Sequence, residues 1–364
     1  MKNKEKVIYI ILGLLFIIAI ITILFLYNNK MTKKADNIQL NYSYKIEDFK
    51  LSDLVKNELS SKNYNVIINN LNKDLINGII EKDIGGGVLT SKGVFSYDNT
   101  NLTTKYYDFK GLVIDYLNYN DKVYYILEND DVSSYSWELI ENNLELSNPK
   151  VLMSGHDSYL NANSIMFVEN NNLYFVYADD IFNKNNKLVN QDFAIYQISD
   201  EKEKTELLNY PSNDEYVINL ESDNHYNNNY YYQTKNNDKY NLYSLDLSTM
   251  NTNLLISSDT EFNDYLSMNG KDAYITKYNQ FIVNDGHNNI ADQKYSGTIK
   301  LFRITDSKAL INTSDANFIY DANTNTIVEI NLGNDFDTYT IKPYMDNKLL
   351  LQTSEDFKIL TFEY

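Results

Sequence analysis

Two hydrophobic patterns divide the chain. Residues 7–27 form an unbroken apolar run, VIYIILGLLFIIAIITILFLY, without a charged side chain. A helix of this length, at about 1.5 Å per residue, matches a hydrocarbon layer of about 30 Å. After position 88, short runs rich in Tyr, Phe, Ile, Val and Leu alternate with clusters of Asn, Asp and Lys, as in strands joined by turns. We therefore expect a single N-terminal transmembrane helix ahead of a mainly β body.

The alternative for the apolar run is a cleaved signal peptide. Such peptides carry a shorter apolar region, about 7–15 residues, followed by a small-x-small cleavage site. Residues 28–32, NNKMT, supply no such site. Lysines flank the run equally on both sides, so they do not orient it. Because every acid except Glu5 follows the run, an anionic cytoplasmic leaflet would repel the domain. We predict a single-pass protein of the cell membrane, with a cytoplasmic tail at 1–6 and an extracytoplasmic C-terminal domain.

A polar linker at residues 28–44 and a short helical segment at 45–87 are expected next. Apolar side chains recur every four residues in the second half of that segment, at Ile67, Leu71, Leu75 and Ile79. The pattern stops at Gly85-Gly86-Gly87, which suits a helix end. We interpret the segment as a stalk or cap packed on the main domain, and the alternative is a partner-binding helix.

A degenerate repeat runs through residues 88–364. Each unit begins with two residues that tolerate positive φ, which make a hairpin turn, and continues as a β-rich run. These pairs are Asn120-Asp121, Asn170-Asn171, Asn227-Asn228, Asn269-Gly270 and Asp346-Asn347. The last interval is long enough for two units, and Asp315-Ala316-Asn317 before FIYD is the expected missing member.

A second register supports the repeat. Two strand-like pairs share one internal spacing, Ile195–Ile198 with Leu207-Leu208 and Leu242–Leu245 with Leu254-Leu255. Shorter versions are Leu301–Ile304 with Leu310-Ile311 and Phe318–Tyr320 with Ile327–Ile330. Four strands in about 45 residues is the size of a propeller blade, and radial stacking buries both faces of each blade. We predict a β-propeller of about six or seven four-stranded blades at 88–364, and the alternative is one or two β-sandwiches.

One unit also resembles a known repeat. Residues 229–257 read NYYYQTKNNDKYNLYSLDLSTMNTNLLIS. This segment resembles a blade of the bacterial propellers related to the YWTD repeats of lipoprotein receptors and to the propeller of TolB. Tyr231-Tyr232-Gln233-Thr234 stands where the receptor family has Tyr-Trp-Thr-Asp, so neither the Trp nor the Asp is kept. The resemblance implies a propeller fold over 88–364, and no functional residue is carried over.

Composition narrows the function classes. The chain of 364 residues has a net charge of −18, and Arg303 is its only arginine. Nucleic-acid binding is therefore not expected, because phosphate neutralisation needs a cationic face. The absence of Cys excludes disulfides, thiol nucleophiles and cysteine-ligated metals. With 33 Tyr and 16 Phe against 12 Gly and 3 Pro, collagen-like and Gly/Pro-rich classes are excluded as well.

No catalytic, cofactor-binding or metal-ligating residue is assigned from the sequence. The three histidines, His156, His225 and His287, lie far apart, and we expect polar surface or turn positions for them. The carboxylate pairs Asp130-Asp131, Asp179-Asp180, and Asp335 with Asp337 are expected to lie in solvated turns.

Two further features have structural explanations. The segment Asp321–Asn325 matches the first half of a calcium loop. It is expected to be a β-turn, because Thr326 and Leu332 stand where the loop needs Gly and Glu. Trp137, the only tryptophan, is expected to be a partly buried blade aromatic.

These observations favour a membrane-tethered extracytoplasmic binding or scaffold protein without catalytic activity or cofactor. Its partners would be the membrane, through residues 7–27, and a protein or glycan ligand outside the cell. The alternative is a cell-surface glycan-active enzyme that uses carboxylates at the propeller channel. A third option is a regulator that contacts another membrane protein through its anchor or residues 48–83. Because the last repeat reaches Tyr364, we expect no hydrolase domain behind it.

Overall fold

A computed structural model of the chain describes part of its length. The described residues are 43–49, 64–72, 75–85, 89–98, 101–129, 136–156, 158–160, 165–182, 188–199, 203–211, 215–218, 225–236, 238–332, 336, 339–345, 347–353 and 356–363. The transmembrane helix predicted at 7–27 lies outside them. Within the described ranges, no helix has the length and apolar character needed to cross a membrane.

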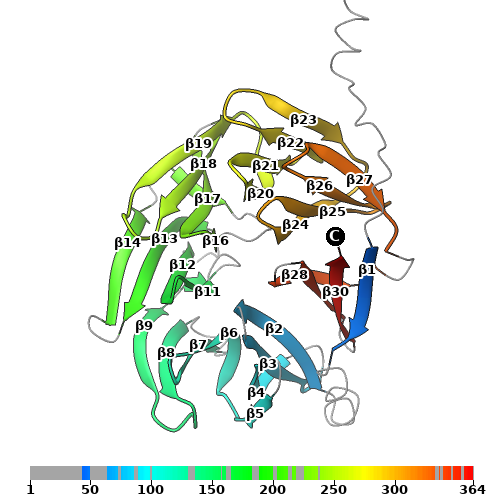
Figure 1. Cartoon of the computed structure of the whole chain (residues 1–364). Coiled ribbons are helices and arrows are strands. Elements are labelled where there is room, and N and C mark those ends of the chain that lie inside the picture. Colours follow the sequence, from blue (N-terminus) through cyan, green and yellow to red (C-terminus); the bar gives the residue numbers. More distant parts are fainter. Residues whose placement is uncertain are drawn as a thin grey trace, which may run out of the picture.

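The described strands form seven antiparallel sheets arranged as blades around a central axis (Figure 1). Blade 1 contains β2 (Tyr64–Asn72), β3 (Leu75–Asp83), β4 (Leu89–Tyr97) and β5 (Leu102–Tyr106). Blade 2 contains β6 (Gly111–Tyr119), β7 (Lys122–Asn129), β8 (Ser136–Asn143) and β9 (Lys150–His156). Each of these blades is a simple up-and-down meander, with its first strand innermost.

In blades 3 and 4, two short strands share the innermost position. Blade 3 contains β10 (Ser158–Leu160) and β11 (Ile165–Glu169), then β12 (Asn172–Phe182), β13 (Leu188–Ser199) and β14 (Glu203–Pro211). Blade 4 contains β15 (Glu215–Ile218) and β16 (His225–Tyr226), then β17 (Asn229–Asn236), β18 (Lys239–Asp246) and β19 (Thr252–Ser258).

The remaining blades return to four strands. Blade 5 contains β20 (Phe262–Met268), β21 (Lys271–Thr276), β22 (Gln280–Asn284) and β23 (Asn289–Lys294). Blade 6 contains β24 (Ile299–Thr305), β25 (Lys308–Thr313), β26 (Asn317–Asp321) and β27 (Thr326–Ile330). Blade 7 contains β28 (Thr340–Met345), β29 (Lys348–Gln352) and β30 (Phe357–Glu363), completed by the N-terminal strand β1 (Ser43–Asp48). The predicted β-propeller is therefore confirmed, with seven blades.

The core of the molecule lies between the blades. Seven clusters of buried apolar side chains occur among the described residues, one at each junction between neighbouring blades. At the junction of blades 3 and 4, for example, Phe193 and Tyr232 pack with ring centroids 5.7 Å apart. Because each fully buried aromatic or aliphatic side chain contributes about 1.5–3 kcal/mol, the stacked blades stabilise one another.

The ring closes through a strand that the sequence patterns did not predict. Strand β1 pairs antiparallel with β30, from Ser43 opposite Glu363 to Asp48 opposite Lys358. The outermost strand of the last blade therefore comes from the start of the described chain, where a linker and a helical segment were expected. Closure of this kind fixes the last blade to the first part of the chain.

The helix predicted across Ile67 and Ile79 is wrong, because β2 and β3 occupy residues 64–83. A spacing of four residues is also a multiple of the strand period of two, so it does not distinguish helix from strand. Strand β3 is apolar on both faces, since Ile76 faces the cluster with blade 7 and Ile79 the cluster with blade 2. Gly85 therefore follows a strand, and the propeller begins before residue 88.

The hairpin turns of the repeat are confirmed. Every described residue of the five predicted pairs has positive φ. These are both residues of the first four pairs, and Asn347 of the fifth. Each pair joins the first and second strands of a blade. The sixth member was misplaced: Asp306-Ser307 joins β24 to β25, whereas Asp315-Ala316 lies in the following turn between β25 and β26.

The second register is confirmed in part. The segments at 195–208 and 242–255 lie in the third and fourth strands of blades 3 and 4, and 318–330 lies in those of blade 6. Leu301–Ile304 with Leu310-Ile311 instead forms the first and second strands of blade 6. Two consecutive strands rich in Ile and Leu show the same sequence pattern in either place, so the pattern alone did not distinguish the first pair of strands from the last pair.

Candidate functional site

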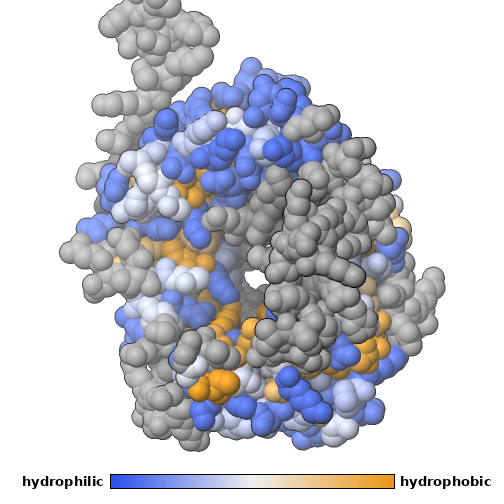
Figure 2. All heavy atoms as spheres, turned by 180° about the vertical axis from the view of Figure 1, so that it is seen from behind, coloured by the Kyte–Doolittle hydropathy of each residue, from blue (hydrophilic) through white to orange (hydrophobic). Residues whose placement is uncertain are grey.

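The inner hairpin turns gather charged and aromatic groups at one mouth of the ring. Figure 2 shows the opening through the middle of the molecule, with hydrophilic residues covering most of the described outer rim. In three blades, the last residue of the inner strand before the Asn turn contacts a residue of another blade. These residues are Tyr119, Glu169 and Tyr226. We call Glu169, His225, Tyr226, Arg303 and Asp306, together with Asn228, the rim cluster.

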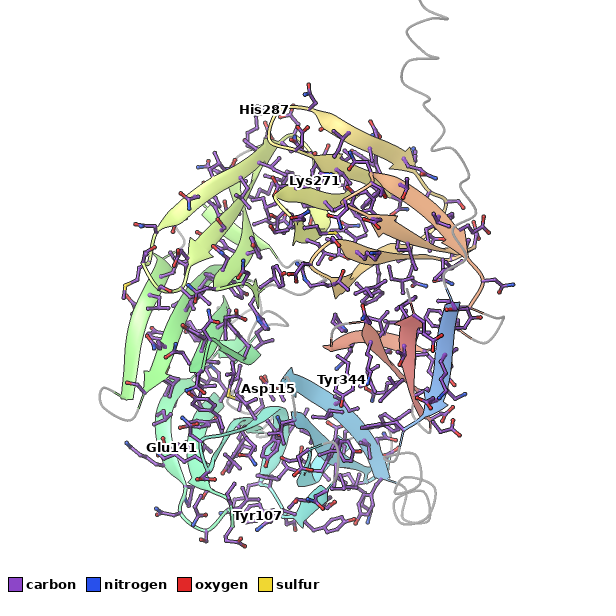
Figure 3. All side chains as sticks on the ribbon, in the orientation of Figure 1. Tyr107, Asp115, Glu141, Lys271, His287 and Tyr344 are labelled. Atoms are coloured by element: carbon purple, nitrogen blue, oxygen red, sulfur yellow. The ribbon has the colours of Figure 1, made fainter. Side chains whose placement is uncertain are left out.

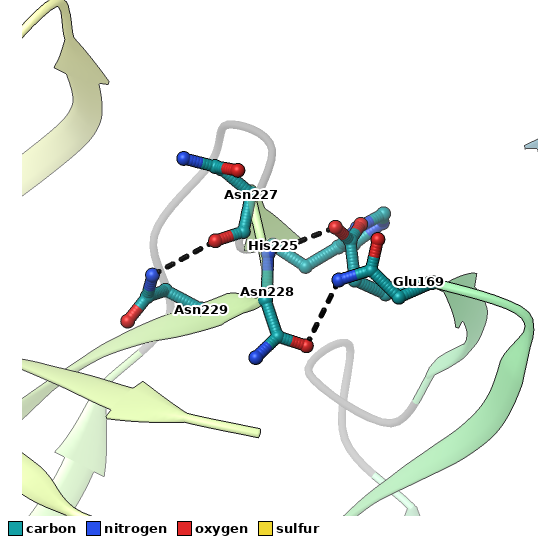
Figure 4. Close-up of polar contacts among 6 residues, drawn as sticks. Glu169, His225, Asn227, Asn228 and Asn229 are labelled. Atoms are coloured by element: carbon teal, nitrogen blue, oxygen red, sulfur yellow. Dashed lines mark hydrogen bonds and ion pairs between the residues drawn. The ribbon is translucent and has the colours of Figure 1, made fainter. Parts of the chain in front are cut away.

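The asparagine turns are linked to one another. Tyr119 Oη donates to the backbone oxygen of Asn171 in the next blade, at 2.6 Å. Asn170 Nδ2 donates to Asn228 Oδ1 at 3.0 Å, so the turns of blades 3 and 4 are joined through side-chain amides (Figure 4). Asn residues thus serve twice here, since they adopt the positive φ that the turn needs and they hold neighbouring turns together.

Glu169 and His225 form a pair within the rim cluster. Glu169 Oε1 accepts the backbone N–H of Asn228 at 2.9 Å, and Oε2 lies 3.5 Å from His225 Nδ1. The His225 ring stacks on Phe167, with centroids 4.2 Å apart and planes inclined by 11°. A carboxylate and an aromatic face therefore fix the orientation of a half-exposed imidazole.

The single arginine, Arg303, reaches the rim cluster from β24 of blade 6. The guanidinium carbon of Arg303 lies 3.5 Å from the centroid of the Tyr226 ring, a cation–π contact. Nη1 of Arg303 donates to the backbone oxygen of Ser267 at 2.8 Å, and Tyr226 Oη donates to Asp306 Oδ1. Blades 4, 5 and 6 are therefore tied together around one cation.

The carboxylates that lie deeper on the inner strands are bound to backbone. Asp115 Oδ1 accepts from Tyr116 N–H at 2.9 Å, and Oδ2 accepts from Met166 N–H of the next blade at 2.7 Å. Asp264 repeats the arrangement with Tyr265 N–H at 3.2 Å and Leu301 N–H at 2.7 Å. Both carboxylates thus connect neighbouring inner strands, and Figure 3 labels Asp115 on the inner side of the ring.

A lysine on the innermost strand of blade 7 also contacts the inner strand of a neighbouring blade. Lys342 Nζ donates to the backbone oxygen of Ile68 in blade 1. Burial lowers the pKa of Lys342, and the nearby charge of Asp115 opposes that shift. The lysine therefore links the last and first blades along the channel.

Sequence reasoning placed some of these residues and missed others. His287 lies in an exposed turn between β22 and β23, as predicted. His225 was expected at a polar surface or turn position, and it lies in β16, where it belongs to the rim cluster. Glu169, Tyr226 and Arg303 were not predicted as site residues. The signal that would have indicated Glu169 and Tyr226 is their place immediately before an Asn pair.

The other predicted positions are structural. Trp137 is 2% exposed in β8, so it is a blade aromatic. Residues 322–325 form a turn between β26 and β27, as predicted, and Asp321 is the last residue of β26. Lys271 Nζ donates to Asn325 Oδ1 at 2.6 Å and to the Ala322 backbone oxygen, so an ammonium occupies the oxygen-lined side of this turn.

The remaining residues give mixed outcomes. Asp179-Asp180 lies within strand β12, so the prediction of a turn is wrong there. Residues 130–131, 335 and 337 lie outside the described residues. His156 ends strand β9. Across the described ranges, no group of three or more His, Asp or Glu side chains is arranged to hold a metal ion.

Comparison with known proteins finds similarity of fold. No protein-family model matches the chain, and no curated protein matches it. An acylaminoacyl peptidase in complex with Z-Gly-Gly-Phe-chloromethyl ketone superposes with a TM-score of 0.51 at 10% identity, over 84% of this chain and 52% of that chain. For dipeptidyl peptidase 4 of Porphyromonas gingivalis the TM-score is 0.50 at 11% identity, over 77% and 47%.

BamB from Moraxella catarrhalis is also similar, with a TM-score of 0.47 at 11% identity over 82% of each chain. The chain spans about half the length of the two peptidase chains. Similarity at this level of identity shows the propeller fold alone.

Proposed function

We propose that this protein is a membrane-tethered binding or scaffold protein without catalytic activity, displayed outside the cell by the helix expected at 7–27. We also infer kinship of its repeat with YWTD and TolB-like propellers, supported by the place of Tyr231-Tyr232-Gln233-Thr234 in β17. No nucleic acid and no cofactor is part of the proposal.

One observation carries the binding role, namely that contacts between blades hold the side chains of the rim cluster at the mouth of the channel. Both oxygens of Glu169, the ring of His225 and the guanidinium of Arg303 are held by neighbouring blades. Groups fixed before binding lose little conformational entropy when a ligand arrives, so such a surface favours recognition. The inner carboxylates Asp115 and Asp264 support a non-catalytic role, because each already accepts two backbone N–H groups.

The binding role is tested with the full-length chain in nanodiscs, against peptide and glycan panels with and without Ca²⁺. We expect a ligand whose affinity falls about tenfold in Arg303→Gln and in Glu169→Gln, because each loses one charged contact. The matched control is Lys294→Gln, an exposed cation in β23 of another blade. Absence of any ligand, or equal loss in the control, would contradict the proposal.

Display outside the cell is tested separately, because the chain contains no Cys. A single cysteine introduced as Tyr278→Cys would occupy a side chain that is 59% exposed. We expect a membrane-impermeant maleimide to label this variant in intact cells, whereas Lys4→Cys in the predicted cytoplasmic tail requires permeabilised cells. The reverse pattern would place the propeller in the cytoplasm.

The alternative of a glycan-active enzyme is favoured by one observation, the pairing of Glu169 with His225 at the channel mouth. A carboxylate that orients an imidazole is an arrangement used in acid–base catalysis. Release of reducing ends from a polysaccharide, abolished by both His225→Gln and Glu169→Gln, would support the enzyme and reject the non-catalytic role.

A further inference from the structure

A second candidate surface lies on the face opposite the rim cluster, in blade 1. An open hollow of about 370 Å³ is lined by Tyr64, Lys92, Tyr106, Tyr107 and Asp108, which we call the tyrosine groove. Tyr64 begins β2 and Tyr106 ends β5. Antiparallel pairing through the blade brings those two strand ends to the edge away from the β2–β3 turn.

The walls of the groove are aromatic and exposed. Tyr106 is 49% exposed and Tyr107 is 44% exposed. The rings of Tyr64 and Tyr106 lie 6.4 Å apart between centroids and are inclined by 39°. Figure 3 shows Tyr107 on the outer side of its blade. In water, tyrosine rings in this position provide apolar faces with polar hydroxyl tips, and a ligand with both characters gains most from them.

The lining of the groove carries one charge of each sign. Lys92 Nζ contacts Asp108 Oδ1 in an ion pair, and the backbone N–H of Tyr107 donates to the Lys92 oxygen at 2.9 Å. The ammonium donates and the carboxylate accepts, so the pair can serve hydroxyl groups in either role. A groove without net charge, on a chain of net charge −18, does not favour an anionic ligand.

A glycine is required to build this arrangement. Gly93 pairs with Tyr106 across β4 and β5. A Cβ atom at this position would lie 2.5 Å from the Lys105 backbone oxygen and 3.1 Å from the Tyr106 Cα. The close approach of β5 to β4 that places Tyr106 in the groove therefore depends on the missing side chain.

The course of the chain at Ser43 shows on which face of the propeller the groove lies relative to the preceding segment. Strand β1 begins at Ser43 and runs antiparallel to β30, whose own end at Glu363 lies on the side of the rim cluster. The apolar segment at 7–27 is joined to Ser43 by residues 28–42. The chain leaves the propeller from the rim side, so the groove lies on the face away from the point of attachment.

We propose that the tyrosine groove binds neutral saccharide units. The apolar C–H face of a pyranose ring would pack on Tyr106 and Tyr107, while its hydroxyls would exchange hydrogen bonds with Lys92, Asp108 and the tyrosine hydroxyls. This inference rests on the proposed role as a binding protein. It names a ligand class for the face of the propeller opposite the rim cluster. A peptide or an anionic polymer is not expected to occupy the groove.

The test uses the full-length chain in nanodiscs with maltotriose, cellotriose and tri-N-acetylchitotriose as neutral probes. Saturation-transfer NMR and calorimetry measure binding. We expect at least one trisaccharide to bind, with affinity about tenfold weaker in Tyr106→Ala and in Tyr107→Ala. Tyr107→Phe keeps the ring and should lose less, and Tyr278→Ala, an exposed tyrosine in blade 5, should lose nothing.

Three results would overturn the inference: no trisaccharide binds, binding is unchanged by both alanine variants, or a proline-rich peptide or polyglycerol phosphate displaces the sugar. Circular dichroism checks the fold of each variant, and Lys92→Gln gives a second test that leaves every ring in place. If trisaccharides fail while other ligands bind the rim cluster, the groove inference alone is wrong. If nothing binds to either face, the proposed function is wrong as well.

Discussion

The side-chain amide of Gln233 in blade 4 pairs with the backbone of Phe262 in blade 5. Nε2 donates to the Phe262 oxygen at 2.6 Å, and Oε1 accepts the Phe262 N–H at 3.1 Å. Gln233 is fully buried. Gln352 occupies the same position in its own repeat unit and donates to the Val66 oxygen at 3.0 Å, across the junction of blades 7 and 1. A glutamine in the second strand of a blade thus forms hydrogen bonds with the backbone of the first strand of the next blade.

Gln233→Leu should lower the free energy of unfolding by about 1–3 kcal/mol, because two buried backbone groups of Phe262 lose their partner. Denaturant titration measures the loss. The control is Gln197→Leu, since Gln197 Nε2 donates to Asn172 Oδ1 within its own blade and is only half-buried. A Gln233→Leu protein as stable as the wild type would show that the pairing between blades contributes nothing.

The closing strand predicts a specific disulfide. Lys45 lies opposite Thr361 in the β1–β30 pair. Lys45→Cys with Thr361→Cys should form a disulfide and stabilise the oxidised protein by about 2–4 kcal/mol, since it links distant parts of the chain. Thermal melting with and without reductant measures the gain. The control, Lys45→Cys with Lys358→Cys, places the thiols out of register, and efficient cross-linking of that pair would contradict the observed pairing.

Glu81 predicts a pH dependence of stability. The side chain is 4% exposed, and its Oε2 has no partner among the described residues. Burial raises its pKa above the ordinary 4.5. The folded state then holds its proton at pH values where the unfolded state has released it. The free energy of unfolding therefore falls as the pH rises from about 4.5 through the raised pKa.

Glu81→Gln should remove that slope and raise stability at neutral pH by roughly 1 kcal/mol. Urea titration between pH 4 and pH 7 checks both effects. Glu145→Gln is the control, because Glu145 is exposed and pairs only at the surface with Lys105, 2.6 Å away. If the free energy of unfolding of the wild type instead rises between pH 4 and pH 7, and Glu81→Gln removes that rise, the predicted sign is wrong.

The contacts of Lys271 lead us to predict that calcium has little effect on the melting temperature. Its ammonium already donates to Asn325 and Ala322 in the turn that resembles half a calcium loop. We expect Ca²⁺ to change the melting temperature by less than about 1 °C relative to EDTA, since no ligand binds the folded state there. Lys271→Met should melt lower in both buffers, whereas Lys294→Met should not. A calcium-dependent rise in the wild-type melting temperature would count against this assignment.

Sequence patterning was sufficient for the repeating parts of the fold. Asn170-Asn171 and Asn227-Asn228 were identifiable as hairpin turns because few residues other than Asn, Asp and Gly adopt positive φ at low cost. The strands that follow these turns were identifiable because blades are buried on both faces and need Tyr, Ile and Leu there. Local chemistry of this kind acts within a few residues, so it can be read along the chain.

Contacts between blades were decided by the tertiary structure. Nothing near Ser43 indicates that it pairs with Glu363, and the apolar spacing around Ile67 suits a helix as well as a strand. The rim cluster likewise unites Glu169, Tyr226 and Arg303 from three blades. Their spacing along the sequence does not indicate that these three side chains lie close together. Turn and strand propensity are properties of short segments, whereas closure of the ring and the meeting of its inner turns depend on how seven blades fill the space around one axis.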